Sequence, residues 1–133
     1  MKRARSVVVA ALASVSAYAA NDAVLKWFFG MPSPRPLLLD GAGHAFHLFA
    51  GAGDSSFPSG HMTLTMSFSA AMMQLHRATA SVLLPLLVVA GAALIVGDWQ
   101  FVSDVLAGAL FGWLAGLLAA ALYKAHFSLA NDR

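Results

Sequence analysis

The stretch from residue 80 to residue 97 runs for eighteen residues without a charged side chain. An apolar run of this length is a candidate for a helix that crosses the hydrocarbon core of a membrane. The whole chain follows the same trend, because 59% of its 133 residues are hydrophobic and only 11% are charged, whereas soluble domains have about 25% charged residues. We therefore predict an integral membrane protein built as an all-α helical bundle.

Further apolar segments predict about four transmembrane helices in a single membrane domain that covers residues 1–133. The first segment would form a helix of about 36 Å at 1.5 Å per residue, which is enough to span a bilayer. The segment before the second helix is rich in proline and glycine, which favours a long outer loop. The expected spans are 6–29, 60–76, 80–97 and 104–127, and the expected loop is 30–58.

Residues 1–19 have a second interpretation. Ala17-Tyr18-Ala19 follows a basic start and an apolar stretch, as a signal-peptidase site does, so residues 1–19 could be a cleaved secretory signal. The helical pattern nevertheless continues past this point, and Asp22 and Lys26, four residues apart, are predicted to form an ion pair on one face. The mass of the mature protein distinguishes a cleaved signal from a retained first helix.

The distribution of basic residues predicts the orientation. Four spans would place the N-terminus, the turn near residue 77 and the C-terminus on one side, and six of the eight basic residues fall there. Basic residues favour the cytoplasmic side, so the 30–58 loop is expected to face the periplasm of a bacterial inner membrane. The six are Lys2, Arg3, Arg5, Arg77, Lys124 and Arg133, and the two on the other side are Lys26 and Arg35.

The segment Phe57-Pro58-Ser59-Gly60-His61 precedes a stretch that reads as a helix. Ser59 is a good N-cap, and Gly60 allows a ligand to approach the backbone closely. The amides of a first helical turn, with the positive end of the helix dipole, can bind an anion, and His61 could exchange a proton with it. The alternative is an ordinary capped helix with a surface histidine.

Other candidate residues are expected on the same outer face as this segment. A phosphoryl group needs positive charge, amide donors and an acid that protonates the leaving oxygen. We predict that Lys26, Arg35, Ser59 and Gly60 bind phosphate and that His61 is the general acid. No metal or other cofactor is implied, because the site is built from basic groups and amides rather than carboxylates. Nucleic acid is not an expected partner, because the basic residues are scattered and the net charge is only +2.

Together these residues resemble the membrane type 2 phosphatidic acid phosphatase family, which is related to the vanadium haloperoxidases. Its three motifs are Lys-x6-Arg-Pro, Pro-Ser-Gly-His and Ser-Arg-x5-His-x3-Asp. The second is complete at residues 58–61, the first is looser because eight residues separate Lys26 from Arg35-Pro36, and the third matches only at its end, from Ser103-Asp104. The resemblance implies a phosphatase whose substrate is a phosphorylated membrane lipid, such as undecaprenyl pyrophosphate or phosphatidylglycerol phosphate.

The third motif departs from the family at its catalytic positions. Gln100 stands where the family has its nucleophilic histidine, and Ala93-Leu94 replace the serine and the phosphate-binding arginine. In the family, the residue corresponding to Asp104 orients that histidine. A glutamine amide is a very poor nucleophile, so the resemblance implies impaired hydrolysis.

Three explanations for Gln100 stay open. The glutamine could be an introduced substitution, or the chain could be a natural relative that binds a lipid phosphate or another membrane protein without turnover. Alternatively, His44 or His47 in the outer loop could serve as the nucleophile, whereas His76 and His126 are predicted on the opposite side.

The last predicted helix carries Gly108, Gly112 and Gly116 at intervals of four residues. Small residues at this spacing allow helices to approach closely in lipid, and we interpret them as a packing face rather than as a site. Ser103 is expected to cap this helix. Most members of the resembled family have six spans, and a homo-oligomer is one way for four helices to bury their remaining faces.

Overall fold

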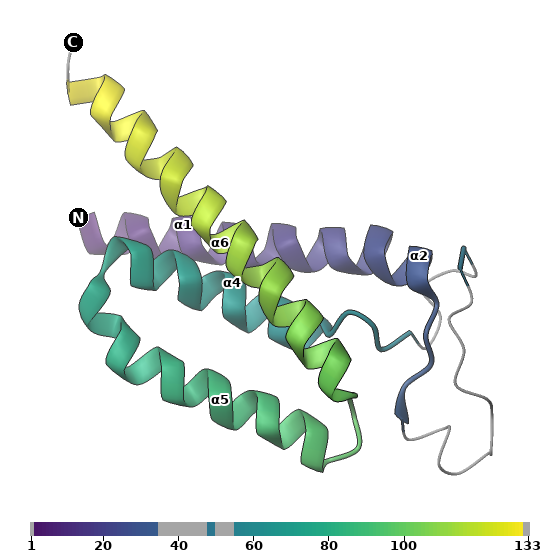
Figure 1. The fold of residues 1–133 in the computed structure, drawn as a ribbon. Helices are drawn as coiled ribbons and strands as arrows, with labels where there is room; N and C mark the ends of the chain where they lie inside the picture. Colours follow the sequence, from purple (N-terminus) through teal and green to yellow (C-terminus); the bar gives the residue numbers. More distant parts are fainter. Residues whose placement is uncertain (1, 35–47, 50–54, 132–133) are drawn as a thin grey trace.

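The computed structural model describes the backbone of residues 2–34, 48–49 and 55–131, and most of these residues are helical, without a β-strand beyond one isolated bridge. The first helix continues through a π-helical turn, and a 3₁₀ turn connects the next two helices (Figure 1). The elements are α1 (Lys2–Ala20), η1 (Asn21–Lys26), α2 (Trp27–Phe29), α4 (Gly60–Leu75), η2 (Arg77–Thr79), α5 (Ala80–Val96) and α6 (Val102–Asn131).

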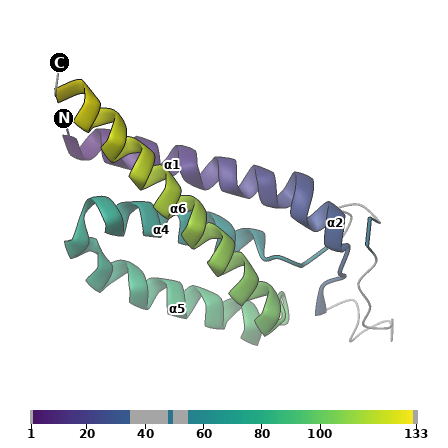
Figure 2. The ribbon, with the colours of Figure 1, turned by 45° about the horizontal axis from the view of Figure 1, so that its top comes forward.

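Helix α4 is the centre of the bundle. Helix α1 runs along it, α6 crosses it diagonally, and α5 lies on the side away from α1 (Figures 1 and 2). Small side chains allow the close packing of α1, since Ala10, Ser14 and Ala17 are buried at intervals of three or four residues. The hydroxyl of Ser14 also donates a hydrogen bond of 2.7 Å to the carbonyl of Leu64.

The glycines of α6 form its contact with α4, which confirms the packing interpretation of their spacing. A Cβ on Gly112 would lie 2.5 Å from the carbonyl oxygen of Thr63 and 3.1 Å from the amide nitrogen of Ser67. A Cβ on Gly108 would meet the backbone of Ser59, and one on Gly116 would meet the backbone of Ser67. Only residues without a side chain permit this separation between the two helices.

Three helical stretches are long and apolar enough to cross a membrane, which confirms an integral membrane protein of all-α class. They cover residues 3–29, 77–96 and 102–127. Helix α4 is shorter, with 16 residues, or about 24 Å at 1.5 Å per residue. Large side chains such as Val88, which is 72% exposed, face outward along the bundle, as lipid-facing side chains do.

The helix ends form two groups at opposite ends of the bundle. Both termini and the η2 turn lie at one end, and the segments around residues 30–34, 55–59 and 97–101 lie at the other (Figure 1). Helix α6 begins at Val102, two residues before the predicted start, and Ser103 is therefore inside the helix rather than its cap. The physical reason is the side chain of Asp104, which accepts a hydrogen bond from the amide of Phe101 and so stabilises the earlier turn.

Candidate functional site

The N-terminus of α4 has two satisfied and two unsatisfied amides. Ser59 is its N-cap as predicted, since its Oγ accepts a hydrogen bond of 3.3 Å from the amide of Met62. The amide of Ser59 itself donates to the carbonyl of Asp104 at 3.0 Å. In the described part of the chain, no acceptor is found for the amides of Gly60 and His61. These two donors point along the helix axis, where an anion is favoured.

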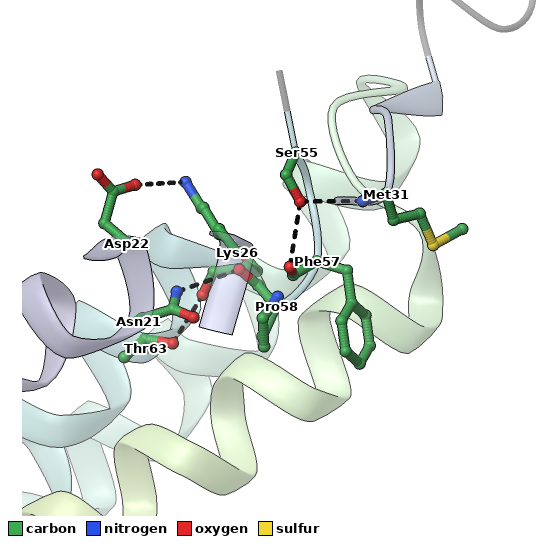
Figure 3. A network of polar contacts seen from close by, with 9 residues as sticks. Asn21, Asp22, Lys26, Met31, Ser55, Phe57, Pro58 and Thr63 are labelled. Carbon is green, nitrogen blue, oxygen red and sulfur yellow. Dashed lines mark hydrogen bonds and ion pairs between the residues drawn. The ribbon is translucent and has the colours of Figure 1, made fainter. Parts of the chain in front are cut away.

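The segment that leads into α4 is anchored from two directions (Figure 3). The side-chain amide of Asn21, which is fully buried, donates a hydrogen bond of 3.1 Å to the carbonyl of Pro58. On the other side, Ser55 Oγ accepts from the amide of Met31 at 3.1 Å and donates to the carbonyl of Phe57 at 3.3 Å. The bond between Phe57 and Pro58 is a cis peptide. The start of α4 is therefore held in place by η1 and by the residues that follow α2.

Lys26 brings a positive charge to this helix start. Its Nζ lies 3.6 Å from the point that a Cβ on Gly60 would occupy, and the ring of Tyr18 lies 2.9 Å from the same point. The Nζ also pairs with Asp22 Oδ1 at 3.0 Å, which confirms the predicted ion pair. The Lys26 side chain is only 18% exposed, whereas that of Asp22 is 49% exposed. The ammonium group is thus held close to the unsatisfied amides by a carboxylate that remains half in solvent.

His61 points toward α5. It is exposed and lines a cavity of about 350 Å³ whose other lining residues, apart from Thr65, are apolar. Ala93 and Leu94 belong to that wall, at the two positions where a serine and an arginine were expected. Lys26 therefore approaches the first turn of α4 from η1, whereas His61 leaves that turn toward α5. The remaining lining residues are Met62, Thr65, Ala90 and Trp99.

Asp104 is fully buried and stabilises the start of α6. Its Oδ2 accepts the amide of Phe101 at 3.0 Å, and its Oδ1 accepts the hydroxyl of Ser103 at 3.3 Å. The first of these bonds is the return bond of a capping box, in which a side chain of the first turn satisfies the amide of the N-cap residue. Because its backbone carbonyl accepts the amide of Ser59, Asp104 also ties the start of α6 to the start of α4.

Gln100 occupies the turn between α5 and α6, directly after Trp99, which lines the same cavity as His61. Its amide donates to the carbonyl of Leu94 at 3.2 Å. Its side-chain Oε1 is buried and has no hydrogen-bond partner among the residues that the structure describes. A buried acceptor without a donor is unfavourable by about 1–3 kcal/mol. The side chain at the nucleophile position is thus poorly satisfied by its surroundings.

Two residues near the helix start were missed by the sequence reasoning. Asn21 holds Pro58, and Tyr18 covers Gly60. The sequence did contain a signal for Asn21. It is a polar amide in an otherwise apolar helix, and such a side chain, when buried, usually has a hydrogen-bond partner. Of the predicted residues, Arg35, His44 and His47 lie outside the described residues.

Comparison with known proteins gives one match. The family model of the PAP2 superfamily matches residues 6–128, which is nearly the whole chain. No curated protein and no solved structure matches the chain significantly. The matched region contains the complete Pro-Ser-Gly-His segment at the start of the central helix, together with all the helices that position it. This chain belongs to the PAP2 superfamily.

Proposed function

We propose that this membrane protein binds a phosphorylated lipid at the start of α4 and hydrolyses it only weakly. In this proposal Lys26, Arg35, Ser59 and Gly60 hold the phosphate, and His61 is the general acid. The lipid belongs to the undecaprenyl pyrophosphate or phosphatidylglycerol phosphate class, and the site faces the periplasm. Membership of the PAP2 superfamily supports the phosphatase-like, lipid-phosphate character of the function.

One observation carries the binding part of the proposal. The amides of Gly60 and His61 are unsatisfied in the described part of the chain, and the ammonium group of Lys26 lies beside Gly60. Two backbone donors, a helix dipole and a cation at one point match the needs of a phosphate group. Gly60 has no side chain at this point, but it is buried against the ring of Tyr18, so that ring must move aside for an oxygen of the ligand to reach the backbone.

The weak hydrolysis follows from the turn between α5 and α6. A phosphatase of this kind needs a nucleophile that attacks phosphorus, and the amide of Gln100 supplies none. Leu94 adds no positive charge to the cavity beside His61. Losing a covalent nucleophile lowers turnover by several orders of magnitude, of order 10⁴ or more in well-studied hydrolases. Binding without rapid turnover is the expected behaviour.

The test compares phosphate release by the purified chain and by its Gln100→His variant, with a phosphorylated isoprenoid and a phosphorylated glycerolipid as substrates. We expect release by the variant to exceed that of the unmodified chain by roughly tenfold or more, because the histidine restores a nucleophile. Gln100→Asn is the matched control, since it keeps an amide and should not gain activity. Equal activity in all three proteins, lost in His44→Ala or His47→Ala, would instead assign the nucleophile to the outer loop.

Binding is tested separately with vanadate, an analogue of phosphate, in the unmodified chain. Lys26→Met is expected to weaken vanadate binding roughly tenfold or more, as the loss of a charge-assisted hydrogen bond does. Lys124→Met is the matched control, because Lys124 lies near the end of α6 at the opposite end of the bundle. If neither vanadate nor phosphate binds the unmodified chain, the proposed anion site is wrong.

A further inference from the structure

A cavity of about 670 Å³ lies at the end of the bundle that carries both termini, far from the start of α4. It is open on one side and is lined by the beginning of α1, the end of α4, the η2 turn and the beginning of α5. Arg3, His76 and Arg77 form its polar side, and Val7, Phe68 and Leu83 are part of its apolar wall. The cavity shares no residue with the proposed phosphate site.

The polar side of this cavity has donors that nothing in the described chain satisfies. Neither Arg3 nor Arg77 forms an ion pair with a described carboxylate. The Nε2 atom of His76 is buried and has no partner among the described residues. The hydroxyl of Thr79 donates to the carbonyl of His76 at 2.8 Å and so leaves the N-terminus of α5 without a side-chain cap. This cluster has the charge and the donors that an anion requires.

The apolar wall continues toward the middle of the bundle. A second cavity of about 550 Å³ shares Phe68 and Leu83 with the first and extends to Leu64 and Ala90. The twelve residue steps from His76, which follows the end of α4, back to Leu64 correspond to about 18 Å at 1.5 Å per residue. Half of a hydrocarbon core of about 30 Å is about 15 Å. The path is therefore as long as an acyl chain in one leaflet.

We propose that this surface binds an anionic phospholipid of the adjacent leaflet, with its phosphate at Arg3 and Arg77 and one acyl chain along Phe68 and Leu83. Basic pockets between transmembrane helices are suited to such head groups. The length of the apolar path favours a lipid over a free anion. A second copy of the chain is a poorer occupant, because a parallel neighbour would bring the same basic end, including Arg5 and Lys124, against this one.

The test titrates the full chain in neutral detergent with phosphatidylglycerol and with phosphatidylcholine of the same acyl chains, and reads bound lipid by native mass spectrometry. We expect tighter binding of phosphatidylglycerol. The Arg3→Gln/Arg77→Gln variant should lose roughly thirtyfold of that affinity, about fivefold for each arginine, and keep its affinity for phosphatidylcholine. Leu83→Trp should weaken both lipids, because it fills the apolar path. Both arginines are exposed, so the charge variant should fold normally.

The control variant is Arg5→Gln/Lys124→Gln, which removes two charges from the same end without touching the cavity. Its phosphatidylglycerol affinity should stay within roughly threefold of the unmodified chain, because only screened, longer-range charge is lost. A loss as large as that of the cavity variant would overturn the proposal in favour of general surface charge. Displacement of the lipid by inorganic phosphate would overturn it in favour of a free-anion site. A chain dimer that Leu83→Trp dissociates, without bound lipid, would identify a second copy as the occupant.

Discussion

Replacing Gly112 by alanine should separate the two most closely packed helices of the bundle. The new Cβ would lie 2.5 Å from the carbonyl oxygen of Thr63 and 3.1 Å from the Cβ of Met66. The first of these neighbours is backbone in the middle of α4, so it cannot rotate away as a side chain could. Restoring an ordinary contact of about 3.4 Å requires the helices to move apart by close to 1 Å, and a gap of that size forfeits up to half of each neighbouring dispersion contact.

Two opposing contributions decide whether Gly112→Ala stabilises or destabilises the protein. Alanine is more favourable than glycine inside a helix by about 1 kcal/mol. Overpacking a close contact typically costs about 1–3 kcal/mol, and more where backbone must shift. We expect the second term to exceed the first, for a net loss of about 1–2 kcal/mol. For a chain of this size, that loss lowers the melting temperature by about 3–8 °C.

The assay is thermal unfolding of the purified protein in one detergent, read by the fluorescence of its tryptophans. The matched control is Gly91→Ala in α5, where a Cβ would meet the side chain of Val105 at 3.2 Å and no backbone atom. Because that side chain can adjust, Gly91→Ala should leave the melting temperature unchanged or slightly raised. A Gly112→Ala protein that melts within about 1 °C of the unmodified chain would refute the packing argument.

Two further predictions concern the buried polar groups that hold the helix starts. Asn21→Ala removes the hydrogen bond to Pro58 and should lower the free energy of unfolding by about 1–3 kcal/mol. Vanadate binding should weaken as well. Unchanged stability and binding would show that this bond does not hold the segment before α4. Asp104→Ala removes the cap on Phe101 and should cost about 1–2 kcal/mol. Asp104→Asn, which keeps an acceptor oxygen, should recover most of that loss in thermal unfolding, and an asparagine variant as unstable as the alanine one would contradict the capping role.

Several features of the fold were predictable because each depends on local chemistry. Ser59 caps α4, and Asp22 pairs with Lys26, because both interactions join residues within one helical turn. Gly112 and its neighbours at intervals of four predicted a close helix crossing because only glycine permits it. The membrane class followed from apolar runs alone.

It was harder to predict which side of each helix faces the bundle core and which side faces lipid. In a soluble bundle the polar face reveals the solvent side, but α5 is apolar on all sides, because both lipid and the bundle core are apolar. The orientation of His61 toward α5 therefore had no sequence signal. The start of α6 was misplaced because the cap depends on a reciprocal bond between Phe101 and Asp104, and Ser103 looked like the better cap by residue type alone.

The π-helical turn at Asn21–Lys26 determines which residues of the first membrane helix share a face. In a regular α-helix, residues five apart are rotated by about 500°, so Asn21 and Lys26 would point roughly 140° away from each other. A π turn closes over five residues and brings them toward the same side. One of them then holds Pro58 while the other reaches Gly60. If the same residues formed a regular α-helix, the composition would be unchanged, but the lysine would turn away from the side on which Asn21 holds Pro58.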